Sequence, residues 1–292
     1  MCGADYPSMK PAPFNYYAPT SLDEAVALLA ELGPQDGRVL AGGQSLVPTM
    51  AFRIARPAHL IDINGIAELA TVTVKDDVLS IGACVRHAAL EADTVPGTTG
   101  ALLRKVVRNI GHYPIRTRGT FCGSVANADP ASEWCCLMAA LDGVVLAHSQ
   151  RGTRRVAAAD FFRGVMATAL EEDELVVAAE LPLLPEGTAT GFVEFSRRKG
   201  DFAIAMALVT YRLESGSIVE PRVAIGGAEP QARRLLEAEA ELDGQMRSRA
   251  AFSRAADAAA SAIDPMEDIN NTAGYRRKLV QTLLQRALET AA

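Results

Sequence analysis

The sequence lacks an unbroken apolar run of membrane-spanning length, although 49% of its 292 residues are hydrophobic. A spanning helix needs about 20 such residues in succession, so we expect no membrane insertion. Basic residues are not in excess either, because 29 Lys and Arg stand against 35 Asp and Glu and give a formal charge of -6. Nucleic-acid backbones are bound by clustered cations, so this balance argues against a nucleic-acid partner.

Cysteine is scarce, with the five residues Cys2, Cys84, Cys122, Cys135 and Cys136 and no C-x-x-C pair. An odd number without paired spacing favours neither a disulfide framework nor a metal or iron-sulfur site in this chain. Cys135 and Cys136 fall in an apolar segment, where core packing is the expected role of a free thiol.

The chain is expected to form several subdomains. Residues 1–13 are a polar lead-in without the features of a secretory signal, so a cytoplasmic location is the default expectation. A helix is predicted over 21–32, because Ser21 and Glu24 form a capping box ahead of an apolar stripe. The patterns that follow predict a short strand at 38–41, strands and turns over 60–85, helices at 88–92 and 100–107, and a buried helix at 130–141 that packs on the preceding strands.

Two prolines and a glycine within residues 181–187 predict a domain boundary near residue 185. The segment beyond it is expected to be α+β. Its patterns predict strands at 191–195, 203–213 and 222–225, and helices at 232–242, 249–263 and 275–288.

The most informative stretch is Ala41-Gly42-Gly43-Gln44-Ser45, a glycine pair that follows a predicted strand. Glycine accepts positive φ and lets the main chain approach a ligand closely, so successive N–H groups can converge on one anion. Taken alone, such a pattern is more often a plain strand-to-helix turn. The G-x-G-x-x-G pattern of dinucleotide-binding βαβ units is absent, so that type of NAD site gains no support.

A second glycine-containing turn is expected over residues 118–124. Its residues 119–124 read Gly-Thr-Phe-Cys-Gly-Ser, and Glu133 follows downstream. Its amides and hydroxyls could face a phosphate, and Glu133 could accept hydrogen bonds from a ribose.

Together the two stretches resemble the flavin motifs of the medium, FAD-binding subunits of the xanthine dehydrogenase and aerobic carbon monoxide dehydrogenase family. The second motif is commonly T-I-G-G-N or T-I-G-G-D there. Residues 200–203, 225–227 and 264–277 also resemble the C-terminal domain of this molybdenum hydroxylase family, so the likeness covers nearly the whole chain.

The resemblance implies an α+β chain with a vanillyl-alcohol-oxidase (PCMH) type FAD-binding domain over residues 14–185. That domain would consist of two α/β subdomains, about 14–63 and 64–185. FAD would extend between these subdomains. Residues 186–292 would form a C-terminal α+β domain like that of the carbon monoxide dehydrogenase flavoprotein, and this domain would cover the flavin.

The same resemblance implies the cofactor-binding residues. Two groups would wrap the FAD diphosphate: Ala41, Gly42, Gly43, Gln44 and Ser45 with the adjoining Leu46, and Thr120, Phe121, Cys122, Gly123 and Ser124. Glu133 would reach the ribose side, Val176 would lie near the adenine, and Phe202 would shield the flavin ring. Lys199 has two interpretations, a solvated basic turn or a cation that stabilises the reduced ring.

The chain departs from the family pattern at two places. Phe121-Cys122 replace the commoner Ile-Gly, so the backbone must avoid a glycine-only conformation there. Gln44 stands where some members have His, and because Gln cannot form a histidyl-flavin bond, FAD should be held non-covalently. His87 and His112 lack a paired acid or nucleophile nearby in the sequence, so neither is assigned a catalytic role.

By resemblance, a large subunit with the molybdenum cofactor hydroxylates the substrate, and a small subunit with two two-iron two-sulfur clusters relays electrons to this chain. A dimer of such heterotrimers is expected. The substrate of the complex stays open among carbon monoxide, purines, aldehydes and N-heterocycles. The electron acceptor stays open among quinone, a protein carrier, oxygen and NAD. The alternatives for this chain are a stand-alone FAD oxidase acting on an alcohol or amine, and a nucleotide-binding regulatory module.

Overall fold

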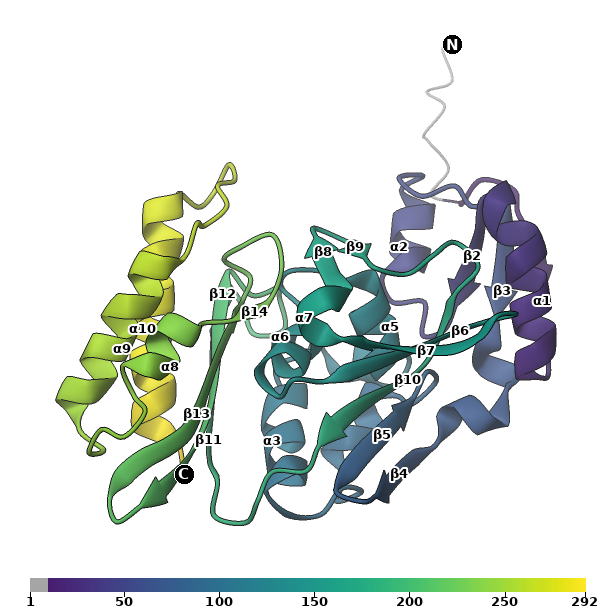
Figure 1. Ribbon diagram of the computed structural model, residues 1–292. Helices are drawn as coiled ribbons and strands as arrows, with labels where there is room; N and C mark the ends of the chain where they lie inside the picture. Colours follow the sequence, from purple (N-terminus) through teal and green to yellow (C-terminus); the bar gives the residue numbers. More distant parts are fainter. Residues whose placement is uncertain (1–9) are drawn as a thin grey trace, which may run out of the picture.

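The computed structural model describes residues 10–292. Cys2 and most of the lead-in expected over residues 1–13 lie outside the described part. Three sheets follow one another across the molecule, with a parallel sheet at the N-terminal end, a five-stranded sheet in the middle and a four-stranded sheet at the C-terminal end (Figure 1). Within residues 10–292, no helix combines the length and apolar character needed to cross a bilayer.

The N-terminal sheet is parallel, in the order β1-β3-β2. Ser21 begins its covering helix, because the Ser21 hydroxyl accepts a hydrogen bond from the N–H of Glu24 at 3.3 Å. The predicted capped helix is therefore confirmed. The elements of this part are β1 (Asn15–Tyr17), α1 (Leu22–Leu32), β2 (Gly37–Leu40), α2 (Leu46–Ala51) and β3 (His59–Asp62).

The central sheet is antiparallel, in the order β4-β5-β10-β6-β7. Helix α5 packs on β5 and β10, so it covers the middle of this sheet. The strands are β4 (Val72–Lys75), β5 (Val78–Gly82), β6 (Val144–Ser149), β7 (Gly152–Ala157) and β10 (Leu175–Pro182), with a small β8 (Phe162–Gly164) and β9 (Ala167–Thr168) pair. The helices are α3 (Gly97–Val107), α4 (Tyr113–Arg116), α5 (Phe121–Asn127), α6 (Glu133–Ala140) and α7 (Ala158–Phe161).

Helix α6 is buried along its whole length, as the sequence predicted, because each of its eight residues is shielded from solvent. Its packing partner differs from the expectation. The main strand contacts of α6 are with β12 and β13, which follow it in the chain, whereas α5 packs on the preceding β5. The helix therefore joins the central part to the C-terminal sheet.

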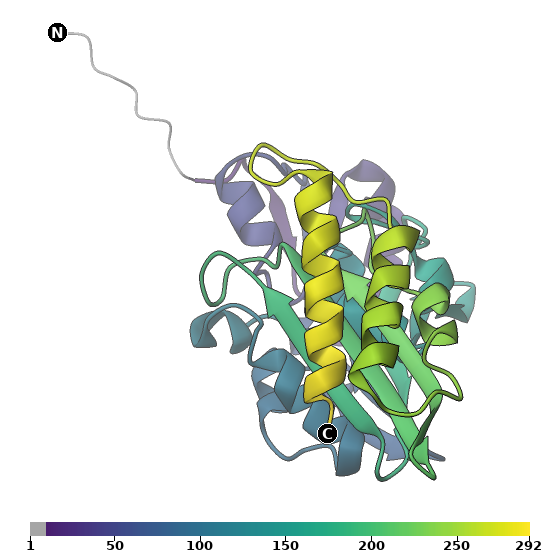
Figure 2. The ribbon, with the colours of Figure 1, turned by 90° about the vertical axis from the view of Figure 1, so that its left-hand side faces the viewer.

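The C-terminal sheet is antiparallel, in the order β11-β12-β13-β14, and helices cover both of its faces. Helices α9 and α10 lie across one face (Figure 2), while α3 and α6 pack on the other. The helix expected over residues 232–242 is wrong in its first part, because Arg233–Arg234 pairs with β13. The elements are β11 (Ala189–Phe195), β12 (Ala205–Glu214), β13 (Ser217–Gly226), β14 (Arg233–Arg234), α8 (Leu236–Ala240), α9 (Arg249–Ala262) and α10 (Ala273–Thr290).

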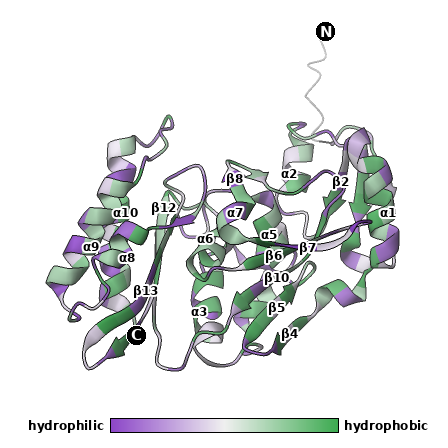
Figure 3. Cartoon of the chain, viewed as in Figure 1, coloured by the Kyte–Doolittle hydropathy of each residue, from purple (hydrophilic) through white to green (hydrophobic). Residues whose placement is uncertain are grey.

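Strand β12 divides two hydrophobic cores between its faces. Met206 and Leu208 belong to the core shared with the central part, whereas Ala207 and Val209 belong to the core under α9 and α10. Successive strand residues point to opposite faces, so both faces of this strand can be apolar only when both are covered. Figure 3 shows the same contrast between inner and outer elements elsewhere in the molecule. The strands β5 and β10 are coloured as hydrophobic, whereas the outer helix α9 also shows hydrophilic residues.

Arg276 ties α10 to the sheet. Its side chain is buried, and Nη1 donates hydrogen bonds to the carbonyl oxygens of Ile204 (2.7 Å) and Gly227 (2.6 Å), while Nη2 pairs with Asp268. One cation thus satisfies two buried main-chain acceptors at the end of the sheet.

Arg276→Met is expected to lower the free energy of unfolding by about 2 to 4 kcal/mol, because both carbonyl oxygens lose their donor. Denaturant unfolding followed by circular dichroism measures the loss. The matched control is Arg249→Met on α9, where the Arg side chain is 86% exposed, and a change within about 0.5 kcal/mol is expected. Equal losses in the two variants would contradict the proposed anchoring role.

Candidate functional site

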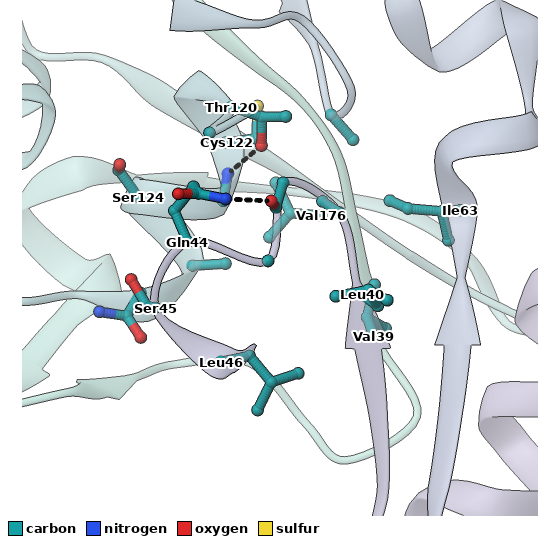
Figure 4. Close-up of a pocket in the computed structure, with 18 of the residues that line it drawn as sticks. Val39, Leu40, Gln44, Ser45, Leu46, Ile63, Thr120, Cys122, Ser124 and Val176 are labelled. Atoms are coloured by element: carbon teal, nitrogen blue, oxygen red, sulfur yellow. Dashed lines mark hydrogen bonds between the residues drawn. The ribbon is translucent and has the colours of Figure 1, made fainter. Parts of the chain in front are cut away.

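A cavity of about 340 Å³ lies between the N-terminal parallel sheet, the start of α5 and strand β10 (Figure 4). Five separate segments of the chain contribute its walls. The lining residues are 38–46, Ile63, Ala83, His87, Gly119, Thr120, Cys122, Gly123, Ser124, Ala126, Asn127, Leu170 and 174–176.

One wall is loop 1, residues 41–45, which connects β2 to α2. Gly43 has φ of +71°, the region that favours glycine, and its carbonyl oxygen accepts from the N–H of Val47 at 3.0 Å. Within the described part of the chain, the N–H groups of residues 42–45 donate to no protein acceptor. Four consecutive main-chain donors beside a cavity form an anion cradle.

The facing wall is loop 2, residues 117–120, with the first turn of α5. Thr120 is the N-cap, and its hydroxyl accepts from the N–H of Gly123 at 3.0 Å. The second motif is therefore mostly a helix start rather than the extended turn expected over 118–124. Cys122 has helical backbone and turns its thiol into the core toward the Ile81 carbonyl oxygen at 3.3 Å, so this departure from the family pattern leaves the cavity open.

Loops 1 and 2 touch through their main chains. A Cβ atom added at Gly42 would lie 2.4 Å from the carbonyl oxygen of Arg118 and 2.6 Å from Cα of Gly119. Only a residue without a side chain permits this approach. Figure 4 shows the resulting arrangement, with Gln44 of loop 1 next to Thr120 and Ser124.

A polar bridge holds the loops in this contact. Asn64 Nδ2 donates to the carbonyl oxygen of Ala41 at 2.7 Å, and Arg86 Nη2 donates to Asn64 Oδ1 at 2.6 Å. The other end of the Arg86 guanidinium donates to the carbonyl oxygen of Arg118. Two side chains outside both motifs thus connect loop 1 to loop 2.

The structure brings together most of the site residues predicted from the sequence. Those that line the cavity are Ala41, Gly42, Gly43, Gln44, Ser45, Leu46, Thr120, Cys122, Gly123, Ser124 and Val176. Phe121, Glu133, Lys199 and Phe202 are not part of the lining. Phe121 instead lies below it and packs on Trp134, with ring centroids 4.7 Å apart.

Glu133 is buried at the start of α6, and burial raises the pKa of its carboxyl to about 7. Glu194 on β11 lies near it, and burial together with the charge of Glu133 raises the pKa of Glu194 to about 8. Among the described residues, Glu194 Oε2 has no hydrogen-bond partner. Both carboxyls therefore hold their protons to a higher pH than exposed carboxyls do.

Lys199 and Phe202 lie on the loop between β11 and β12, and both are exposed, Phe202 to 75%. This loop packs on the turn before α4. A Cβ atom at Gly200 would come within 2.7 Å of the His112 ring. The roles predicted for Lys199 and Phe202 beside a flavin stay predictions, because neither side chain contacts the cavity wall.

The cavity also has residues that the sequence did not assign to it, above all Glu174, which it left unmentioned, and His87, which it considered only for a catalytic role. Glu174 receives two hydrogen bonds from Arg154, at 2.5 and 2.7 Å, and these hold the pKa of its carboxyl below the ordinary value. Its partner is 20 residues away, so no local motif announces the pair. His87 could have been noticed only as a polar residue within an apolar segment.

Comparisons with known proteins agree with this geometry. Residues 12–184 match the FAD binding domain in molybdopterin dehydrogenase, and residues 191–291 match the CO dehydrogenase flavoprotein C-terminal domain. The chain belongs to this family of FAD-binding medium subunits.

Its relatives are similar over nearly their whole length. The 6-hydroxypseudooxynicotine dehydrogenase complex subunit alpha of Paenarthrobacter nicotinovorans is 37% identical, over 97% of this chain and 96% of the relative. The carbon monoxide dehydrogenase medium chain of Hydrogenophaga pseudoflava is 34% identical, over 97% of this chain and 98% of the relative. A solved structure of quinoline 2-oxidoreductase from Pseudomonas putida 86 has a TM-score of 0.92 at 35% identity, covering 97% of this chain and 98% of that one.

The residues of the cavity fit the cofactor of this flavoprotein family. A diphosphate needs converging donors, and loop 1 supplies four free N–H groups. It also needs close approach of the main chain, and Gly42, Gly43 and Gly123 line the cavity without a side chain. The expectation of an FAD-binding chain of the molybdenum hydroxylase family is confirmed.

Gly42→Ala is expected to weaken FAD binding by about a hundredfold or more. The new methyl group must separate loop 1 from loop 2, which costs two or more charge-assisted hydrogen bonds of roughly 1.5 to 3 kcal/mol each. Quenching of flavin fluorescence during titration of the flavin-free chain measures the affinity. Gly274→Ala on α10 is the control, because a Cβ atom there meets nothing within 4 Å. FAD binding by Gly42→Ala at the parental affinity would refute the need for the contact.

Glu194→Gln is expected to reduce the loss of stability as the pH rises from 5 to 8. The folded-state pKa of Glu194 lies above its unfolded value, so its favourable contribution is complete below about pH 4.5 and is lost as the pH rises through about 8. The variant should therefore lose less Tm between pH 5 and pH 8 than the parent in calorimetry. Glu186→Gln, at an exposed site, should follow the parent. Identical profiles of Glu194→Gln and the parent would show that Glu194 is charged in the fold.

Proposed function

We propose that this chain holds FAD non-covalently in the cavity between loops 1 and 2, as the electron-transfer subunit of a molybdenum-containing hydroxylase or dehydrogenase. The observation that carries the proposal is that residues 42–45, whose N–H groups have no protein acceptor, and the first turn of α5 line the same cavity. Neither loop alone would distinguish a cofactor site from an ordinary turn.

Each wall has a distinct part in holding the cofactor. The N–H groups of loop 1 and the Ser124 hydroxyl would bind the diphosphate oxygens, while Leu175 and Val176 of β10 offer an apolar surface for a ring. Gln44 stands in loop 1 and cannot form a covalent bond to a flavin in the way that His does. These residues therefore support a dissociable cofactor.

When bound, FAD supplies the capacity to accept electrons singly and to release them singly or in pairs. The chain contributes position, shielding from water and electrostatics. Its cavity contains no arrangement of nucleophile and base among the described residues, which suits a subunit that passes electrons on. We assign no catalytic acid or base to this chain.

The names of the relatives support a partnership with two other subunits. They include medium chains, a medium subunit and subunits of dehydrogenase complexes. We propose a large subunit with the molybdenum cofactor, a small subunit with two two-iron two-sulfur clusters, and a dimer of such heterotrimers. Because the relatives are named for substrates as unlike as carbon monoxide and caffeine, substrate choice belongs in the large subunit.

The described cysteines suit a protein that resides in a reducing compartment, the cytoplasm. Cys84, Cys122, Cys135 and Cys136 are all free and buried. Burial raises the pKa of the Cys84 thiol to about 11, and burial likewise raises the pKa of the other three thiols. They are core thiols of the kind found in proteins that keep their cysteines reduced.

Purification of the tagged full chain from its native cells is expected to yield a yellow complex with two further subunits, molybdenum and iron. Acid precipitation should release one FAD per chain, because the cofactor is held by hydrogen bonds. Absorption spectroscopy and metal analysis check both statements. A flavin that stays on the precipitated chain, or oxidation of alcohols or amines by the isolated chain, would favour the stand-alone oxidase instead.

A further inference from the structure

His87 has a hydrogen-bonding arrangement that fixes which of its nitrogens carries the proton. Trp134 Nε1 lies 2.9 Å from His87 Nδ1, and both side chains are buried. An indole N–H can only donate, so Nδ1 of His87 must be the acceptor. The proton of the uncharged ring therefore sits on Nε2.

The His87 ring is uncharged at neutral pH. Burial, with help from the nearby cations Arg116 of α4 and Arg86 of its own turn, lowers the pKa of His87 to about 4. Glu91 does not offset this, because it is already paired with Arg116. Protonation would also place two donors face to face, since Trp134 already points its N–H at Nδ1. His87 thus presents a single, fixed donor at Nε2.

That donor lies at the cavity and has no partner in the protein. His87 is 3% exposed and belongs to the cavity lining. Its Nε2 edge lies against loop 2, because a Cβ atom at Gly119 would be 2.6 Å from Nε2. Within residues 10–292, Trp134 is the one hydrogen-bond partner of the ring. Nε2 is not among the fully buried unpaired atoms of the described residues, so it retains accessible surface and can donate to a ligand atom.

The neighbours of His87 indicate what the ligand atom is. Its main-chain N–H donates to the carbonyl oxygen of Gly119 at 2.9 Å, and Gly119 is the residue that contacts Gly42 of loop 1. The ring therefore lies where the two loops meet, beside the free N–H groups of residues 42–45. Donors that converge in this way suit an anionic oxygen.

We propose that His87 is a further FAD-binding residue, which donates its Nε2–H to an oxygen of the diphosphate, and that Trp134 is a positioning residue that sets the His87 tautomer. The inference rests on the proposed binding of FAD between the loops. It assigns a role to a buried polar side chain of the cavity lining that has no other hydrogen-bond partner on its Nε2 side among the described residues.

The test measures how tightly the flavin-free full chain binds three probes, which are FAD, ADP and riboflavin. ADP has the diphosphate without the flavin, and riboflavin has the flavin ring without phosphate. His87→Phe is expected to weaken FAD and ADP by the same factor, about tenfold to a hundredfold, which is one hydrogen bond to a charged group. His87→Gln, which retains an N–H donor, should recover part of the affinity. Riboflavin binding should not change.

The control is His148→Phe, since His148 lies on β6 beside Thr153 and outside the cavity.

A measurement on the parent chain tests the tautomer without any substitution. In ¹⁵N-histidine spectra, His87 should show the Nε2–H form from pH 5 to 8 and a shift of its Nε2 resonance on addition of ADP. Trp134→Phe should mix the tautomers of His87 and lower FAD affinity less than His87→Phe does.

Three outcomes would overturn the proposal while leaving the proposed function intact: parental FAD and ADP affinity in His87→Phe, a loss confined to riboflavin, or an Nδ1–H tautomer in the parent. Failure of the parent itself to bind FAD would instead refute the proposed function.

Discussion

The contact between Gly42 and the main chain of Arg118 and Gly119 is the constraint on which the site depends. Loop 1 belongs to the parallel sheet, and loop 2 leads into the helix that covers the central sheet. Their contact therefore fixes one subdomain against the other. It also places the free N–H groups of residues 42–45 beside the start of α5 on a single cavity, so that an anion can be bound without a lysine. A side chain at Gly42 would separate both the loops and the subdomains.

Side chains outside the motifs preserve that contact. Asn64 and Arg86 connect the loop carbonyl oxygens from one side. From below, Phe121 packs on Trp134, and the Trp134 indole in turn holds the His87 ring against Gly119. Arrangements of this kind keep main-chain donors in position before a ligand arrives, which lowers the entropy cost of binding. The rigid part of the site is thus larger than its lining.

The sequence predicted those parts of the site that depend on main-chain geometry, because positive φ at Gly43 and close approach at Gly42 require glycine itself. It also predicted helices with caps or strong periodicity, such as α1, α9 and α10. Residues whose partners are distant in the chain could not be found, since Asn64, His87 and Glu174 carry no local signal. The first part of the helix expected over 232–242 was wrong because tertiary contacts override composition: Arg234 pairs with Asp142 and Glu239 while its strand joins β13.

Helix α6 explains how the C-terminal domain can act on a cavity that it does not line. Its first turn carries Trp134, which orients His87 at the cavity, and Glu133, which faces Glu194 of the C-terminal sheet. Because β12 and β13 cover this helix, Glu133 is cut off from water, and its carboxyl favours the neutral form. A shift of the sheet would therefore change the hydration of Glu133 and the position of Trp134 together. The C-terminal domain thus reaches the cavity residue His87 through a buried helix rather than through a shared wall of the cavity.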